Sequence, residues 1–139
     1  MQIHIANTNE KEKVFALRFE VFVDEQNVPP EIEIDEKDDH AIHIIAEEEG
    51  VTVGCARAVL SENSAYIGRI AVKKNLRGRH IGIQICRFVI DYCEEQGCKY
   101  IWLNAQVPAQ GFYEKLGFKS EGEPFIEAGI EHIKMSMEI

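Results

Sequence analysis

A short basic turn is the most chemically suggestive part of the sequence. Between Val72 and Gly82 the chain reads Val-Lys-Lys-Asn-Leu-Arg-Gly-Arg-His-Ile-Gly, which places four of its 15 lysine and arginine residues within seven positions. The whole chain is acidic, with a formal net charge of -9, so this concentration of positive charge is local. Clustered cations beside glycine suit a bound anion, because glycine lets the anion approach the backbone closely. We therefore predict an anion site at this turn.

The residues that follow the turn indicate a phosphate ligand. Apolar side chains recur there at helical spacing, which predicts that the turn opens a helix. These residues are Ile81, Ile85, Phe88, Val89 and Tyr92. A helix N-terminus offers unpaired N–H groups and the positive end of the helix dipole, both of which favour phosphate. Gly78 and Gly82 match neither a Walker loop nor a dinucleotide fingerprint. A basic turn that merely caps a helix is the alternative interpretation.

Length and composition predict one domain, residues 1–139, since 45% hydrophobic content is enough for a single core. The sequence has no leader pattern and no apolar run near 18 residues, so we expect a cytoplasmic protein with no membrane partner. The basic region is too small for a nucleic-acid partner. No metal is expected, because the four cysteines form no C-x-x-C pair and three of them lie in apolar patterns. These three are Cys55, Cys86 and Cys93, and the fourth is Cys98.

The stretch from Asp24 to Asp39 is strongly acidic, with eight carboxylates around Pro29 and Pro30 and only Lys37 opposing them. Two interpretations stay open. The stretch is either a solvated loop or an acidic wall beside a cleft, whose field would attract a cationic substrate.

Hydrophobic patterns predict the elements that position these groups. In chain order they are a strand at 2–5, a helix from Thr8 to about Phe22, strands at 41–46, 51–60 and 64–72, a helix at 81–96, a strand at 100–103, a helix from Pro108 to Gly117 and a strand at 130–139. Short connections make the strands between 41 and 72 an antiparallel meander, whereas the helix at 81–96 favours a parallel pairing across it. The predicted fold class is α/β (α+β), with a mixed, twisted sheet.

Two motifs resemble the GCN5-related N-acetyltransferase (GNAT) family. The basic turn is similar to the family's pyrophosphate loop, Gln/Arg-x-x-Gly-x-Gly/Ala, with Arg77 and Gly82 at its ends and His80 where the family has its middle glycine. About 30 residues later, the segment from Phe112 to Phe118 resembles the family's second acetyl-CoA motif, aromatic-Tyr-x-x-x-Gly-Phe. The stretches 18–29 and 127–132 are further similar to the small bacterial ElaA and YjcF-like branch.

The resemblance implies a single GNAT-like domain with about six to seven strands, a central helix after the fourth strand and a splayed parallel pair that forms the acyl-CoA cleft. Acetyl-CoA would be the co-substrate, and a primary amine of a small molecule or peptide would attack its thioester directly. The residues implied for cofactor binding are Ile70, Ala71 and Val72 for the pantetheine, Arg77, Gly78, Arg79, His80, Ile81 and Gly82 for the pyrophosphate, and Asn104, Phe112 and Tyr113 near the thioester.

Direct attack needs a base and is helped by an acid. An amine with a pKa of about 10.4 is almost wholly protonated at pH 7, so a base or a water relay must remove its proton. Tyr113, with an ordinary pKa of about 10, fits the acid that protonates a CoA thiolate whose thiol pKa is about 8.5. Glu127 with His132 is the preferred base, although Glu25, His43 and bulk water stay open.

Other functions also remain open from the sequence. A non-catalytic acyl-CoA sensor or partner-binding module would use the same turn, and a homodimer is compatible with either function. A different nucleotide-binding α/β protein is disfavoured, because no acidic ribose partner follows Gly82 at the required distance. The identity of the acceptor is not encoded in any motif.

Overall fold

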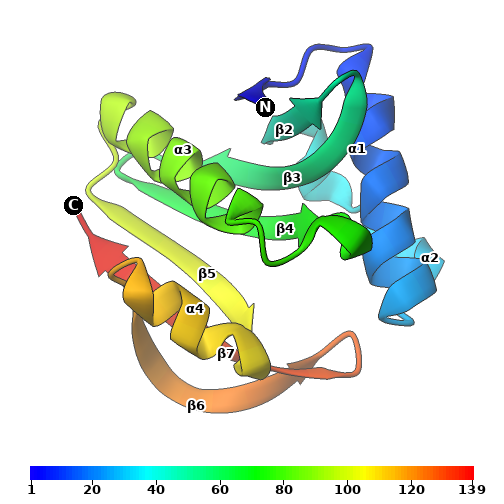
Figure 1. The fold of residues 1–139 in the computed structure, drawn as a ribbon. Coiled ribbons are helices and arrows are strands. Elements are labelled where there is room, and N and C mark those ends of the chain that lie inside the picture. Colours follow the sequence, from blue (N-terminus) through cyan, green and yellow to red (C-terminus); the bar gives the residue numbers. More distant parts are fainter.

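The computed structural model describes residues 1–139 as one twisted sheet with helices on both faces (Figure 1). Its elements are β1 (Gln2–Ile5), α1 (Glu10–Arg18), the π-helix η1 (Phe19–Glu25), α2 (Pro30–Glu33), the 3-10 helix η2 (Glu36–Asp39), β2 (Ile42–Glu48), β3 (Val51–Leu60), β4 (Ser64–Val72), η3 (Lys74–Leu76), α3 (Ile81–Glu95), β5 (Tyr100–Gln106), η4 (Val107–Ala109), α4 (Gln110–Lys115), β6 (Lys119–Glu127) and β7 (Ile130–Glu138). None of the helices has the length and apolar composition needed to cross a bilayer.

The sheet has seven strands in the order β1-β2-β3-β4-β5-β7-β6. Only β4 and β5 run parallel, and α3 connects them. The mixed sheet, the meander of β2 to β4 and the parallel pairing across α3 are therefore confirmed.

The parallel pair splays apart after three residue pairs. Pairing between β4 and β5 runs from Ser64 opposite Tyr100 to Tyr66 opposite Trp102 and then stops. The rest of each strand continues without a partner on that side, so the sheet opens, as the family resemblance implied. β4 also bulges where Arg69 adopts a left-handed conformation with φ 51°, which places one extra residue opposite β3 and bends the strand.

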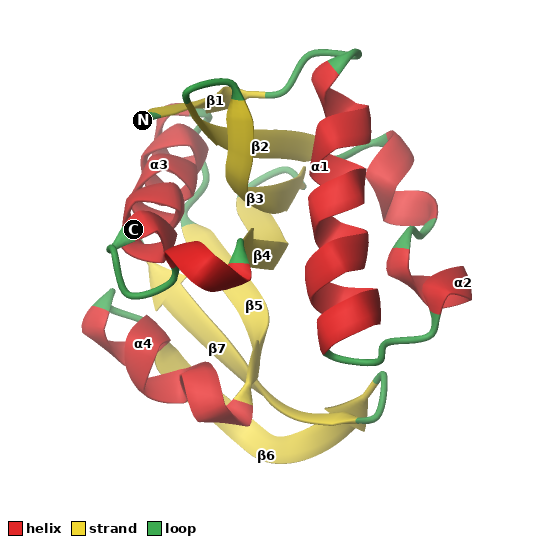
Figure 2. Ribbon diagram, turned by 45° about the vertical axis from the view of Figure 1, so that its right-hand side comes forward, coloured by secondary structure: helices red, strands yellow, loops and turns green.

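An apolar layer covers each face of the sheet, and Figure 2 shows α3 and α1 on opposite sides of its central strands. On one face, α3 buries a helical stripe against the central strands, as its apolar spacing predicted. On the other face, Val14, Leu17 and Val21 pack against β2, β3 and β4. All four cysteines are free and buried, and burial raises the pKa of Cys86 to about 12. A thiol with that pKa is almost entirely protonated near neutral pH.

The start of α1, the end of β5 and the whole of β6 differ from the sequence prediction. α1 begins at Glu10, where Asn7 and Glu10 bond each other's backbone N–H, so Thr8 is not the cap. The strand predicted at 100–103 continues to Gln106, because Asn104 places its polar side chain on the open face of the sheet instead of ending the strand. β6 was not predicted. All nine of its residues are exposed, so it lacks the apolar alternation that identifies a strand.

Candidate active site

The splay between β4 and β5 opens into a cavity of about 350 Å³. Its walls come from both strands, from the segment that carries α2 and η2, from the start of α4 and from the hairpin between β6 and β7. Five predicted site residues meet at this cavity. They are Ile70, Asn104, Tyr113, Glu127 and His132.

The basic turn follows β4 and leads into α3. Gly78 and His80 both adopt left-handed backbone conformations, with φ 85° and 63°. His80 therefore reproduces a backbone conformation that glycine adopts most readily, at a cost that histidine tolerates better than β-branched residues do. As the N-cap of α3, His80 makes no side-chain capping bond, so no side chain occupies the first N–H groups of the helix.

Most cations of the turn are engaged by carboxylates. Arg77 makes a bidentate ion pair with Glu25 at 2.5 and 2.9 Å, and its Nε donates to the carbonyl oxygen of Val72 at 3.0 Å. The bonds from Arg77 hold the pKa of Glu25 below its ordinary value. Farther along the turn, Arg79 donates to Glu48 at 3.3 Å. The positive excess of the turn is thus smaller than the sequence alone indicates, and any bound anion must compete with these carboxylates.

Tyr113 lies on α4, where its ring packs edge-on against Phe112 and Phe118 with centroid distances of 5.1 and 6.1 Å. Burial, and secondarily the nearby Cys86, raises the pKa of Tyr113. The phenol therefore keeps its proton throughout the neutral range, which a general acid requires. The same shift makes each proton transfer more costly than for an exposed tyrosine.

Glu127 and His132 reach the cavity from the hairpin of β6 and β7. Glu127 is exposed and ends β6, whereas His132 lies within β7 and is only 9% exposed. The Nδ1 atom of His132 lies 2.7 Å from the carbonyl oxygen of Ile130. A carbonyl can only accept, so Nδ1 carries the hydrogen and Nε2 of the neutral ring bears the lone pair. Nε2 is therefore the ring nitrogen that could accept a proton.

The two other candidate bases are occupied elsewhere. Glu25 is bound by Arg77, as described above. His43 is 1% exposed, lies outside the cavity lining and bonds the carbonyl oxygen of Asp38 through Nε2 at 3.0 Å. Burial lowers the pKa of His43.

A buried ion-pair network stands behind one wall of the cavity, and sequence reasoning missed it. Its members are Arg18, Arg57, Arg69, Glu33, Asp35 and Asp38. At its centre, Arg18 donates from Nε to Glu33 at 2.7 Å and from Nη1 and Nη2 to Asp38 at 2.7 and 3.1 Å. Burial alone would raise the pKa of Asp38, but the bonds and charges around it outweigh burial and hold the pKa well below its ordinary value.

The outer part of the network faces the cavity. Arg57 bonds Asp35 and Asp38 through Nη1 at 2.8 and 3.2 Å, and Arg69 bonds Glu33 and Asp35 at 3.2 and 3.5 Å. The acidic stretch is therefore neither a simple solvated loop nor an unpaired acidic wall, because the carboxylates it turns toward the cavity already face arginines. One sequence signal was available: Arg57 interrupts an apolar strand, and a buried arginine requires a carboxylate partner.

Two further groups of side-chain contacts were not predicted, and of their residues Tyr66, Gln26 and Gln106 line the cavity. Tyr66 stacks on Trp102 with a centroid distance of 4.2 Å, and Lys134 lies 5.0 Å above the Trp102 ring. Across the cleft, the side-chain amide of Gln106 donates to Gln26 at 2.8 Å. The aromatic stack joins β4 to β5 at the last pair before the strands separate, and the amide bond ties β5 to the residue that follows η1.

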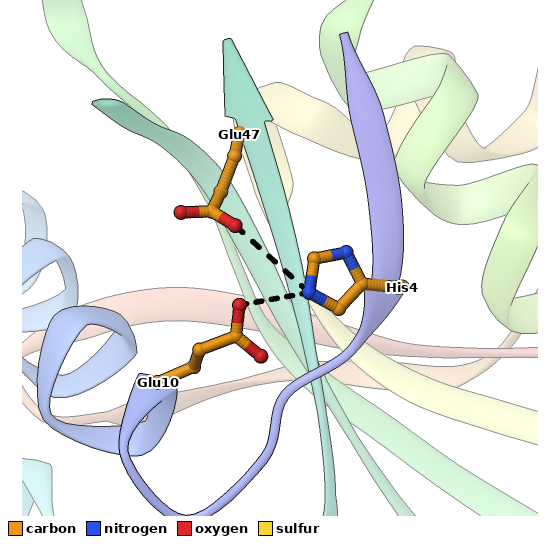
Figure 3. Close-up of side chains that lie close together, drawn as sticks. All are labelled: His4, Glu10 and Glu47. Atoms are coloured by element: carbon orange, nitrogen blue, oxygen red, sulfur yellow. Dashed lines mark hydrogen bonds and ion pairs between the residues drawn. The ribbon is translucent and has the colours of Figure 1, made fainter. Parts of the chain in front are cut away.

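One group of possible metal ligands lies at the opposite edge of the sheet, where β1, α1 and β2 meet (Figure 3). His4 Nε2 lies 2.8 Å from Glu10 and 3.9 Å from Glu47. Glu10 also accepts the N–H of Asn7, and Lys13 lies 3.6 Å from Glu47. These side chains already bond protein partners that cap α1, so their arrangement is explained without a cation.

Comparison with known proteins gives consistent matches over the full length. A family model for the acetyltransferase (GNAT) domain matches residues 5–139. The uncharacterized N-acetyltransferase YjcF of Bacillus subtilis is 38% identical over 138 residues, covering 97% of this chain and 98% of YjcF. ElaA of Escherichia coli is 34% identical over 128 residues, covering 88% of this chain and 84% of ElaA.

Solved structures show the same fold. The crystal structure of Escherichia coli ElaA matches with a TM-score of 0.87 and 31% identity, covering 99% of this chain and 97% of that one. A GNAT family acetyltransferase from Elizabethkingia anophelis, with acetyl-CoA bound, matches with a TM-score of 0.78 at 19% identity, covering 99% of this chain and 97% of that one.

Proposed function

The chain belongs to the GNAT acetyltransferase family, and we propose that it transfers the acetyl group of acetyl-CoA to a primary amine of a small molecule or peptide. The observation that carries this proposal is the splay of β4 and β5, which opens a cavity whose lining includes a tyrosine, a histidine and a carboxylate. A family neighbour holds acetyl-CoA in the same fold, which supports acetyl-CoA as the co-substrate.

The cofactor would bind along the unpaired half of β4 and at the start of α3. The backbone of Ile70, Ala71 and Val72 would bond the pantetheine, because β4 has no β5 partner along these residues. The turn from Arg77 to Gly82 would hold the pyrophosphate at the uncapped N–H groups of α3. Asn104 would contact the pantetheine from β5, and Phe112 would pack beside the turn, since its ring already lies 3.4 Å from where a Cβ on Gly82 would sit.

The chemistry would proceed by direct attack of the amine on the thioester carbonyl. His132 would accept the amine proton at Nε2, with Glu127 attracting the ammonium form to the same side of the cavity. Attack forms the new C–N bond, and collapse of the intermediate breaks the C–S bond. Tyr113 would then donate its phenolic proton to the departing CoA thiolate. General acid and base help of this kind is typically worth about 10² to 10⁴ in rate for each group.

The test combines binding and turnover. Calorimetry with acetyl-CoA, CoA, NAD and ATP should show binding of the first two alone, and a panel of primary amines should release CoA thiol. Replacing Gly82 with valine should weaken CoA binding by at least about tenfold, a loss of about 1.4 kcal/mol, because branched methyl groups would cover the approach to the α3 N–H groups. Gly82→Ala is the matched milder variant, since a single Cβ meets the edge of the Phe112 ring at 3.4 Å and a methyl group of Val72 at 3.7 Å.

Two outcomes would change the proposal. Unchanged CoA affinity in Gly82→Val would remove the turn from the site. Tight acetyl-CoA binding with no thiol release for any amine would favour a non-catalytic acyl-CoA sensor instead.

A further inference from the structure

The two sides of the cavity carry opposite charges that the protein itself does not neutralise. We propose that the acceptor is a free amino acid, whose carboxylate binds Arg57 and Arg69 while its amine lies beside Glu127 and His132. This inference rests on the proposed acetyl transfer and names the acceptor for it.

Among the ion-pair network and the charged side chain that lines the cavity beside it, positive charges exceed negative charges by one. Four cations gather there, namely Arg18, Arg57, Arg69 and Lys37, against three carboxylates, namely Glu33, Asp35 and Asp38. Lys37 lines the cavity and makes no ion pair. The remaining acidic residues of this segment are exposed and do not line the cavity. One more anion would therefore balance this wall.

The arginines also have unused hydrogen-bond donors. Arg57 is 1% exposed, and both of its hydrogen bonds are made by Nη1. Its Nε is buried without any partner, although a buried donor usually has one. In a guanidinium group, Nε–H and an Nη2–H lie along one edge and together match a carboxylate. Arg69, which bonds through Nε and Nη2, keeps its Nη1 donors free.

The hairpin side has the complementary charge. Glu127 lines the cavity, is exposed and makes no ion pair. His132 lines the same wall and bonds the carbonyl oxygen of Ile130 through Nδ1, which leaves Nε2 without a protein partner. Tyr66 lies between the two sides: besides burial, which is the largest effect, the charge of Glu127 raises its pKa while the charges of Arg57 and Arg69 lower it. An ammonium group is attracted to Glu127, and a carboxylate to the arginines.

The size of the cavity further narrows the choice of acceptor. A cavity of about 350 Å³ is near the lower end of the range of roughly 300 to 1,000 Å³ for small-molecule sites. Part of it must also admit the acetyl end of the cofactor. A single amino acid fits this space and carries both required charges at short separation, whereas a polyamine offers only positive charge.

The experiment compares amino acids with their decarboxylated counterparts as acceptors. The pairs are L-lysine with cadaverine, L-phenylalanine with phenethylamine, L-leucine with isopentylamine and β-alanine with ethylamine. Thiol release should show kcat/KM at least about tenfold higher for the amino acid in one or more pairs, because a hydrogen-bonded charge pair contributes about 10- to 100-fold. The three side chains report the preferred shape of the acceptor, and β-alanine reports the preferred spacing between its amine and its carboxylate.

Variants tie this preference to the arginines. Arg69→Gln should raise KM for the preferred amino acid about tenfold or more, and by clearly more than it raises KM for the decarboxylated counterpart. The matched control is Arg87→Gln, which removes the same charge from the exposed face of α3, makes no ion pair and lies outside the cavity. Arg57→Lys keeps the buried charge but removes the fork, so it should lower the same preference in a protein that still binds acetyl-CoA.

The outcomes separate this inference from the proposed function. Transfer to amines without any preference for the carboxylate, or equal losses for both members of a pair in Arg69→Gln, would overturn the inference and leave acetyl transfer standing. If acetyl-CoA binds but no acceptor reacts, the same amino acids are titrated into the CoA complex in a calorimeter. Absence of binding by every one of them would overturn the inference. Failure to bind acetyl-CoA would overturn both.

Discussion

Replacing Asp38 with asparagine should strongly destabilise the fold, because this carboxylate is the hub of the buried network. Its side chain is 3% exposed and accepts four N–H groups: two from Arg18 at 2.7 and 3.1 Å, one from Arg57 at 3.2 Å and the backbone N–H of Asp35 at 2.9 Å. An amide of the same shape keeps the volume but removes the charge and replaces one acceptor with a donor. Arg18, itself 1% exposed, then has only Glu33 to neutralise it.

The magnitude follows from this unpaired charge. Breaking a buried ion pair by removing one partner costs about 3 to 5 kcal/mol, a large share of the roughly 5 to 15 kcal/mol that stabilises a typical domain. For a chain of this length, such a loss lowers Tm by about 10 to 20 °C. The control is Asp39→Asn, which makes the same substitution at the next, exposed residue and should change stability by less than about 0.5 kcal/mol.

Chemical denaturation at several pH values tests the cause as well as the size. The folded-state pKa of Asp38 lies below its ordinary value of 3.8, so its contribution is fully present above about pH 4 and is lost as the pH falls further toward the folded-state pKa. The difference between wild type and Asp38→Asn should therefore be constant from pH 7 to about pH 5 and shrink below about pH 4. In an Arg18→Met background, Asp38→Asn should lower the free energy of unfolding by less, because the positive charge that it would leave unpaired is no longer present. A loss under about 1 kcal/mol at pH 7, or a difference that widens in acid, would refute this account.

Three further predictions concern the site itself. Tyr113→Phe keeps the packed ring and removes only the hydroxyl, so single-turnover acetyl transfer should fall by about 10²-fold with CoA affinity unchanged, and equal rates would exclude the tyrosine as acid. His132→Gln should lower kcat by about 10²-fold or more, whereas Glu127→Gln should mainly raise KM for the amine; the reverse order in steady-state kinetics would reassign the base. Glu25→Gln releases Arg77 from its ion pair and should tighten CoA binding by up to about fivefold at low salt, with a smaller gain at high salt; weaker binding in calorimetry would mean that Glu25 positions the arginine.

The parts of the fold that the sequence predicted are those with a local pattern. β2, β3 and α3 each carry a run of apolar residues with a clear period, and their connections are short. β6 has no such run, because it is an exposed edge strand that contains Gly122 and Pro124 and is ordered by pairing with β7. Asn104 was predicted to end its strand because it is polar, yet a polar residue is natural on the open face of a sheet, where alternation places it.

The cofactor half and the acceptor half of the candidate site also differ in whether a local sequence pattern predicts them. The basic turn and the Tyr113 motif are each contained in fewer than a dozen consecutive residues, so their types and spacing are visible in the sequence. The wall of the cavity that carries α2 and η2, here called the acceptor wall, is built by ion pairs between residues 15 to 36 positions apart in the chain. No local pattern records which arginine meets which carboxylate. The charge of the acidic stretch was correctly counted, but its effect depends on partners that only the folded sheet supplies.

The same ion pairs also hold the acceptor wall in place. The segment that carries α2 and η2 is short of buried apolar side chains, and Ile32 and Ile34 on it are 46% and 41% exposed. Hydrophobic burial therefore contributes little to holding it against β3 and β4. Its attachment comes from Glu33, Asp35 and Asp38, through bonds to arginines on α1, β3 and β4. Charge-assisted bonds fix the position of this wall without apolar side chains packed against it. The cavity beside the wall therefore stays available for an acceptor.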